Sequence, residues 1–247
     1  GPAVPPGCLG VLSGGSGDLD EDLQPRPRPP TPKLLLSPAP CGSPGPSLLV
    51  LVPSAPSHIP HRLAVRDTWG SPSPSPGSPR TLFVLGVPAG PGERRDVLGE
   101  WRRHRDLVLG DLPDSYPALA LKTLLLLRWA LRCCPGAPFV LKADDDTFVN
   151  PPAIATYLAA PATPRRLYLG RVHWRVVPDR DPRGRHHVPA RFYRGSAFPP
   201  YCSGTAYVLS RQAAIEVLAA ASGLPLFAGL PEDVWVGLCA RRAGLWP

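Results

Sequence analysis

The 247-residue chain contains no methionine, not even at position 1, which predicts a fragment or a chain whose leader has been removed. No stretch reaches the roughly 18 uninterrupted apolar residues that a membrane-spanning helix needs, so any membrane anchor is expected before Gly1. The only asparagine, Asn150, is followed by proline, which excludes N-glycosylation of these residues.

Cysteine spacing excludes a common class of zinc site. None of the six cysteines belongs to a Cys-x-x-Cys array, so a zinc finger or zinc ribbon is not expected. An even number of cysteines permits disulfides, but sequence leaves their pairing open. For Cys239, which lies in an apolar helical stretch, a buried free thiol is an equal alternative.

Positive charge is concentrated in one segment. The formal net charge is +8, and residues 165–194 hold nine arginines against Asp179 and Asp181. Such a patch suits a phosphate-rich ligand, an acidic glycan or nucleic acid. No helix-turn-helix, zinc-finger or aromatic RNP pattern accompanies it, so no nucleic-acid partner is expected. A solvated loop without any ligand is the alternative interpretation.

The chain divides into two parts. Residues 1–46 include twelve prolines together with glycines and serines, and they predict a flexible stem. From residue 47 to residue 247, short apolar runs alternate with helix-compatible segments. This alternation predicts an α/β domain with a mostly parallel sheet flanked by helices on both faces.

Three consecutive carboxylates, Asp144, Asp145 and Asp146, follow an apolar strand that begins at Phe139. Open α/β sheets place ligand groups beyond the carboxyl ends of their strands, and adjacent carboxylates suit a hard cation such as Mg²⁺ or Mn²⁺. An EF-hand is excluded because the glycine and glutamate of that loop are missing. A solvated acidic turn is the alternative, which the apolar residues on both sides disfavour.

A second acidic pair, Glu232 and Asp233, begins a helix amid apolar neighbours. One of these carboxylates is a candidate general base that would deprotonate an incoming hydroxyl. The alternative is a capping pair, which is common where acids begin a helix.

Six segments in the same order carry a resemblance to a known family. They are Arg62-x-x-x-Arg66-x-Thr68-Trp69, Asp114-Ser115-Tyr116, Leu121-Lys122-Thr123, and the stretches 140–149, 199–210 and 232–237. Together they resemble the β-1,3-galactosyltransferases (glycosyltransferase family 31), which include related N-acetylglucosaminyltransferases and, more distantly, the Fringe enzymes. The resemblance spans residues 48–245. Residues 168–176 and 184–188 are similar to ganglioside-forming members.

The resemblance implies a GT-A fold, UDP-galactose as donor, Mn²⁺ as cofactor and inversion at the anomeric carbon. Asp146, with Asp144, matches the metal ligands, and Asp233 matches the catalytic base. The positions that match nucleotide contacts are Arg66, Asp114, Lys122, Asp144 and Asp145. The residues expected near the acceptor are Glu232, Trp174, Tyr201 and Gly204. For Arg66 and Lys122 the structural alternatives are a surface helix charge and a snorkelling lysine.

The implied reaction moves galactose to the 3-hydroxyl of an acceptor sugar, here of a ganglio-series glycolipid. From the basic segment 165–194 we further expect that the carboxylates of a sialylated acceptor meet Arg171, Arg175 and Arg185. The alternatives are an N-acetylglucosaminyltransferase of the same family and an inactive truncated remnant. The family carries a metal-binding histidine downstream, so we expect one beyond Pro247 and a domain incomplete at its C-terminus. The implied location is the Golgi membrane, with a luminal catalytic domain and a single type II anchor outside this chain.

Overall fold

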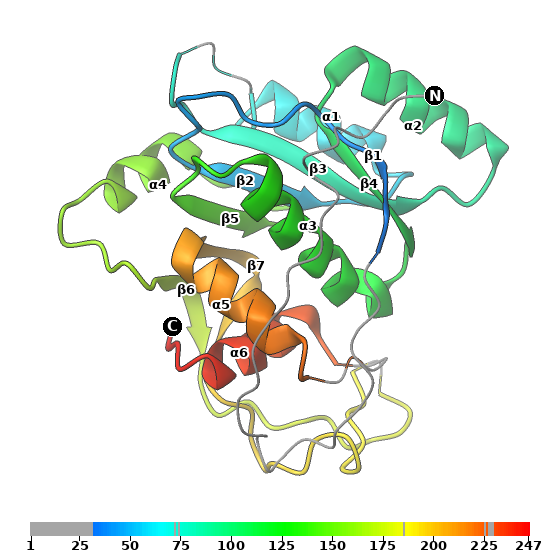
Figure 1. Ribbon diagram of the computed structural model, residues 1–247. Coiled ribbons are helices and arrows are strands. Elements are labelled where there is room, and N and C mark those ends of the chain that lie inside the picture. Colours follow the sequence, from blue (N-terminus) through cyan, green and yellow to red (C-terminus); the bar gives the residue numbers. More distant parts are fainter. Residues whose placement is uncertain (1–31, 72, 74, 185, 225, 227–229) are drawn as a thin grey trace.

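The computed structural model describes residues 32–247 except 72, 74, 185, 225 and 227–229. Its centre is a seven-stranded sheet in the order β1-β4-β3-β2-β5-β7-β6 (Figure 1). The strands are β1 (Leu34–Leu36), β2 (Leu49–Pro53), β3 (Arg80–Val87), β4 (Leu107–Pro113), β5 (Phe139–Ala143), β6 (Tyr168–His173) and β7 (Tyr201–Ser210). Strands β4, β3, β2 and β5 are mutually parallel, whereas β1, β7 and β6 each pair antiparallel with their neighbours.

Helices cover both faces of the sheet (Figure 1). They are α1 (Ile59–Asp67), α2 (Pro91–His104), α3 (Leu119–Cys133), α4 (Pro151–Leu158), α5 (Arg211–Ala221) and α6 (Glu232–Arg242), with a 3₁₀ turn over Tyr116–Ala118. In β2, Leu49 and Leu51 pack toward α3, α5 and α6, while Val50 and Val52 pack toward α1, α2 and α4. Because successive side chains of a strand point to opposite faces, a strand buried on both sides is continuously apolar. The α/β architecture expected from the sequence is confirmed.

The direction of β7 positions the site. Its residues pair antiparallel with β5, with Ala206 opposite Ala143. The beginning of β7 therefore lies beside the carboxyl end of β5, where the three aspartates follow. The backbone N–H of Asp144 extends this pairing by donating to the carbonyl of Thr205 at 3.0 Å. Helix α6 contacts β7 directly, so its first residues reach the same end of the sheet.

Part of the segment assigned to the stem belongs to the folded domain. Leu34–Leu36 form the edge strand β1, which pairs with β4, and Cys41 forms a disulfide with Cys134 after α3. Sequence composition favoured a stem because prolines surround this short apolar run. The partners that order it are more than 70 residues away, and local composition does not reveal them. Residues 1–31 lie outside the described part of the chain.

Among the described residues, no helix is both long and apolar enough to span a membrane. The longest described helix, α3, has 15 residues and packs inside the protein against α5, α6 and the sheet. Cys202 and Cys239 are buried free thiols, as the alternative interpretation of Cys239 expected.

Candidate active site at the carboxyl ends of the central strands

The three aspartates after β5 have three different environments. Asp144 accepts a 2.5 Å hydrogen bond from Lys142. Asp145 accepts from Ser54 Oγ at 2.7 Å. Asp146 is exposed, and with the described residues it makes no hydrogen bond or ion pair. The turn thus offers one outward-facing carboxylate beside two that are already held in place.

Lys142 lies at the centre of the acidic groups. Its ammonium group is buried, donates to Asp144 and to the carbonyl of Gly204, and lies 3.7 Å from Glu232 Oε2. Burial by itself would lower the pKa of Lys142, but Glu232 and Asp144 outweigh it and raise that pKa. Burial raises the pKa of Asp144, and Lys142 opposes this shift. Lys142 is therefore a permanent buried cation that joins β5, β7 and α6.

Asp233, the candidate base, is held by two backbone N–H groups. Gly204 donates to its Oδ2 at 2.9 Å, and Val234 donates to its Oδ1 at 2.9 Å. The carboxylate is half-buried at the first turn of α6, where the helix dipole favours negative charge. Gly204 therefore touches the base directly, and a Cβ at this position would lie 3.3 Å from Asp233 Oδ2.

From the sequence we expected Glu232 to contact the acceptor, but its side chain points into the protein. Its side chain is buried, and Thr123 and Tyr207 both donate to its Oε1 at 2.7 Å. These bonds tie the start of α6 to α3 and β7. The geometry supports a structural anchor for Glu232, which leaves the more exposed Asp233 beside it to face solvent.

Asp114 and Lys122, both predicted nucleotide contacts, are paired with each other. Lys122 Nζ lies 2.8 Å from Asp114 Oδ2 and donates to the carbonyl of Ser54 at 2.8 Å, while the N–H of Gly86 donates to the same Asp114 oxygen at 2.9 Å. Burial lowers the pKa of Lys122, and Asp114 partly restores it. The pair links the ends of β2, β3 and β4 at the edge where the aspartates emerge from β5.

Arg66 is the predicted site residue that the structure does not bring to this edge. Its guanidinium group pairs with Asp106 and Glu100 at 2.7 Å each. Asp106 immediately precedes β4, whereas Asp114 follows it, so the length of a strand separates Arg66 from the acidic turn. Arg62, one helical turn earlier, pairs with the same Glu100. The two arginines form a buried ion-pair network.

The predicted acceptor residues Tyr201 and Trp174 lie at the adjoining ends of β7 and β6. Tyr201 is buried and stacks on His173 with 5.2 Å between ring centroids. Burial, with a contribution from Asp233, raises the pKa of Tyr201 to about 12. The Trp174 side chain is 65% exposed. A large exposed indole is a surface on which a sugar ring can stack.

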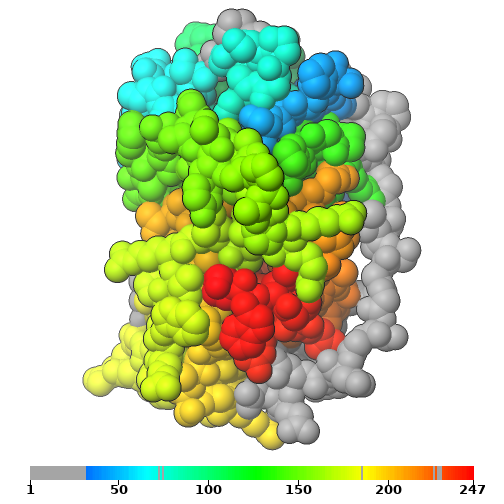
Figure 2. Space-filling view, turned by 90° about the vertical axis from the view of Figure 1, so that its left-hand side faces the viewer, coloured from blue at the N-terminus to red at the C-terminus, as the bar shows by residue number. Residues whose placement is uncertain are grey.

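The arginine-rich segment begins at the α4–β6 side of the molecule, which Figure 2 presents in yellow-green next to the red C-terminal residues. Arg166 joins the two by donating to the carbonyl of Ala243 at 2.8 Å. Arg171 and Arg175 are exposed, and Arg185 lies outside the described residues.

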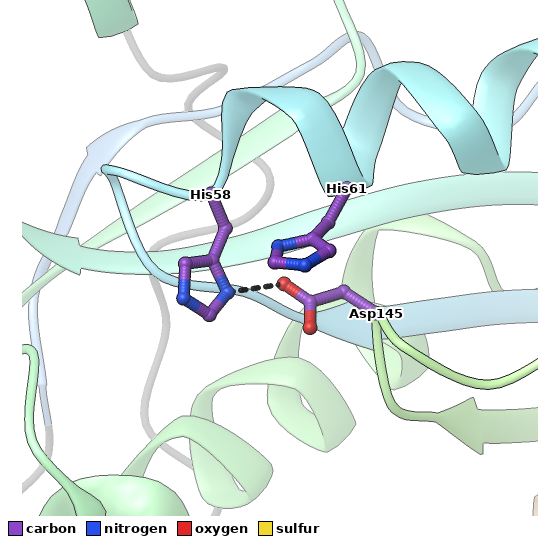
Figure 3. Close-up of side chains that lie close together, drawn as sticks. All are labelled: His58, His61 and Asp145. Carbon is purple, nitrogen blue, oxygen red and sulfur yellow. Dashed lines mark hydrogen bonds and ion pairs between the residues drawn. The ribbon is translucent and has the colours of Figure 1, made fainter.

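A cluster that sequence reasoning missed lies beside the aspartates. His58 Nδ1 is 2.9 Å from Asp145 Oδ2, and His61 completes a group whose ligand atoms lie within 4.8 Å of one another (Figure 3). A His-x-x-His spacing at a helix start was visible in the sequence. Its acid partner was not, because Asp145 is 84 residues further along the chain than His61.

The described residues thus form an α/β domain whose sheet ends in an acidic turn, with a second carboxylate at the start of a neighbouring helix. Its family is given by sequence: the chain belongs to the galactosyltransferase family, whose model matches residues 60–247.

The similar proteins include two enzymes with different donors. The chain is 41% identical to mouse beta-1,3-galactosyltransferase 4 over 249 residues, covering 87% of this chain and 66% of that protein. It is 45% identical to human UDP-GlcNAc:betaGal beta-1,3-N-acetylglucosaminyltransferase 8 over 207 residues, covering 82% of this chain and 51% of that protein. The chain therefore spans about half to two thirds of these relatives.

Two solved structures are also similar. Staphylococcus aureus TarS 1–349 has a TM-score of 0.45 at 15% identity, covering 78% of this chain and 55% of that one. The mannosyltransferase PcManGT from Pyrobaculum calidifontis, solved with GDP-Man and Mn²⁺, has a TM-score of 0.42 at 16% identity, covering 82% and 53%.

Proposed function

We propose that this chain is the catalytic part of an inverting β-1,3-galactosyltransferase that uses UDP-galactose. The observation that carries the proposal is the connection from Asp233 through Gly204 and Lys142 to Asp144. This connection holds a candidate base and a candidate donor-binding turn in one rigid unit. The similarity to a mouse β-1,3-galactosyltransferase supports galactose as the transferred sugar.

In the proposed reaction Asp233 removes the proton from the 3-hydroxyl of the acceptor sugar. The acceptor oxygen forms a bond to the anomeric carbon, while the bond from that carbon to UDP breaks and UDP leaves with the electron pair. The two backbone N–H groups that hold Asp233 fix the orientation of its carboxylate. Attack on the face opposite the leaving group inverts the anomeric configuration.

The residues of the turn fit a hard divalent cation. The exposed Asp146 carboxylate, together with the Asp144 oxygen that does not contact Lys142, provides the oxygen donors that Mn²⁺ and Mg²⁺ prefer. When bound, such an ion offsets the negative charge that develops on a diphosphate leaving group. Lys142 neutralises Asp144 from the inner side, so the turn can hold several carboxylates together before any donor is present.

Asp114 is the best-placed nucleotide contact. The bonds from Gly86 and Lys122 both use Oδ2, which leaves Oδ1 for a hydroxyl of the donor. Lys122 acts by fixing Asp114 and the end of β2. Asp145 acts by fixing the turn against Ser54 after β2 and against His58 at the start of α1. For Arg66, whose partners lie at the other end of β4, we propose a structural role.

The test is sugar transfer from UDP-galactose with and without Mn²⁺, measured on a panel of glycolipid and glycoprotein glycans. We expect galactose transfer that Asp233→Asn reduces by at least about 1,000-fold, since this replacement removes the base without removing its bulk. Asp67→Asn, a change of an exposed acid at the end of α1, serves as the matched control. Turnover that survives in Asp233→Asn would refute the assignment of the base.

Transfer of N-acetylglucosamine is the second candidate, because the human N-acetylglucosaminyltransferase is 45% identical to this chain. Parallel assays with UDP-N-acetylglucosamine decide between the donors. Binding of UDP without transfer from either donor would instead favour an inactive remnant.

For the acceptor we propose a sialylated ganglio-series glycolipid, in which the carboxylates of sialic acid meet the exposed Arg171 and Arg175. The double variant Arg171→Gln/Arg175→Gln should lose more activity on the sialylated acceptor than on its asialo counterpart. Equal losses on both would contradict this acceptor assignment.

We propose a luminal Golgi location, with anchoring by a segment outside this chain. The Cys41–Cys134 disulfide supports an oxidising compartment, because such bonds rarely persist in the cytosol. Protease protection of the domain in intact Golgi vesicles tests this location, and digestion without detergent would contradict it.

A further inference from the structure

Two histidines at the start of α1 face the turn that follows β5. His58 is the N-cap residue of α1 and His61 lies in its first turn, a spacing of three that places both on one side of the helix. Their rings lie 4.5 Å apart in an edge-to-face arrangement. Figure 3 shows both imidazoles directed toward the Asp145 carboxylate, and their potential ligand atoms all lie within 4.8 Å of one another.

The Asp145 carboxylate is oriented by a chain of buried donors. Ser54 Oγ donates to its Oδ2 at 2.7 Å, and Arg62 Nη1 donates to Ser54 Oγ at 2.9 Å. Metal sites commonly use such outer-shell hydrogen bonds to hold a carboxylate ligand in position. Only 11% of the Asp145 side chain is exposed, so the group is partly shielded from water.

The positive charges around this cluster have their own partners. Arg62 forms a 2.7 Å ion pair with Glu100, and Lys122 lies 2.8 Å from Asp114. Each of these cations is paired with an acid other than Asp145. The approach of a divalent cation is therefore not opposed by an unpaired positive charge from these two residues.

We propose that His58, His61 and Asp145 form a transition-metal site, with Zn²⁺ as the best-fitting ion, separate from the hard-cation site at Asp146. Two imidazole nitrogens and one carboxylate oxygen are a donor set typical of Zn²⁺ sites that keep a fourth position open. Mn²⁺ binds such nitrogen donors less tightly than Zn²⁺ does. On binding, the contact between His58 Nδ1 and Asp145 is replaced by bonds to the ion, and each imidazole binds in its neutral form with its one ring proton on the nitrogen that does not contact the ion.

The proposed ion would join two elements that carry the site. His58 and His61 come from α1, and Asp145 comes from the turn that also holds Asp144 and Asp146. Bound Zn²⁺ would therefore stiffen the turn against the rest of the domain. It would do so without occupying the exposed Asp146 carboxylate.

The test is a titration of the whole chain with ZnCl₂ alone, without nucleotide sugar, by calorimetry and by the rise in Tm. We expect one ion per chain. His61→Gln should weaken binding by about 100-fold and Ser54→Ala, which removes only an outer-shell donor, by about tenfold. Co²⁺ should give the visible absorption of a low-coordinate nitrogen and oxygen site, which His61→Gln abolishes.

His104→Ala, a histidine change at the end of α2, is the matched control and should bind Zn²⁺ as the unmodified chain does. Because His61 is exposed, its replacement should leave the fold intact, which the Tm without metal verifies. Absence of Zn²⁺ binding, or equal binding by the unmodified chain and His61→Gln, would overturn the proposal. Asp146→Asn separates the two sites: it should keep Zn²⁺ binding and lose sugar transfer.

Discussion

The backbone N–H of Gly204 donates to Asp233 Oδ2 at 2.9 Å, while the carbonyl of the same residue accepts from Lys142. A single glycine at the start of β7 thus touches both the candidate base on α6 and the buried cation on β5. These two bonds fix the position of the Asp233 carboxylate relative to the acidic turn after β5. The relative position of the candidate base and the acidic turn therefore follows from the pairing of β7 with β5.

Replacing Gly204 with alanine should reduce catalysis without unfolding the protein. The new Cβ would lie 3.3 Å from Asp233 Oδ2, so the carboxylate must shift by a few tenths of an ångström. Because reacting groups must be closely aligned, we expect kcat to fall by up to about 100-fold. Steady-state kinetics check this, with the KM for the donor unchanged. Gly99→Ala, on α2 with open space around it, is the matched control. A normal kcat in Gly204→Ala would show that Asp233 does not need this contact.

Replacing Lys142 with methionine should destabilise the fold. The change leaves the buried Glu232 without a counter-charge and removes the partner of the more exposed Asp144, and breaking a buried ion pair costs about 3 to 5 kcal/mol. Urea denaturation measures the loss in the free energy of unfolding. Lys33→Met, at an exposed lysine, should have little effect. If both variants were equally stable, the buried network would contribute nothing.

The ion pairs of Glu100 with Arg62 and Arg66 predict a pH dependence. Burial by itself would raise the pKa of Glu100, but the two guanidinium groups lower it below its ordinary value of 4.5. A carboxylate with a lowered pKa stabilises the fold above its unfolded pKa, and this stabilisation is lost as pH falls through the folded pKa.

Glu100→Gln should therefore reduce the free energy of unfolding by about 3 to 5 kcal/mol at pH 7, because it removes the ion-pair partner of the buried Arg62 and one of the two carboxylates that pair with Arg66. The difference in the free energy of unfolding between the variant and the unmodified chain should become smaller only below pH 4.5. Denaturation curves at several pH values check this. Asp96→Asn, at an exposed acid of α2, is the control. A gap independent of pH would contradict the role of the Glu100 charge.

Removing the Cys41–Cys134 disulfide should destabilise the domain. The bond closes a span of 93 residues and ties the segment after β1 to the end of α3. The double variant Cys41→Ala/Cys134→Ala, which leaves neither partner as a free thiol, should lose about 2 to 5 kcal/mol of unfolding free energy. Chemical denaturation under oxidising conditions measures it. An unchanged midpoint would show that β1 is held by its pairing with β4 alone.

Local pattern was enough to predict several parts of this protein. The apolar run from Phe139 followed by three aspartates predicted a strand ending in a ligand site, and β5 ends at Ala143, directly before them. The apolar segment after residue 118 predicted a buried helix, which is α3. In each case the residues that form the element also determine its surroundings, because a continuous apolar sequence must be buried on every side.

Contacts between distant segments could not be predicted in this way. The pairing of Lys122 with Asp114, the burial of Glu232 against Tyr207, and the direction of Arg66 all depend on the order and register of the strands. The same is true of β1, whose partner strand begins more than 70 residues later. The stabilisation from these contacts arises between groups that only the folded structure brings together.

The sequence by itself determined the class of fold, the acidic turn and the acid pair at the start of α6, since each is written in consecutive residues. The tertiary structure decided which of these acids face outward. It buried Glu232 and left Asp233 half-exposed, and it joined Asp145 to two histidines of α1 while Asp146 stayed exposed. The reason is physical: exposure and pairing of a charge depend on what packs around it, and here the neighbours come from strands and helices far apart in the chain.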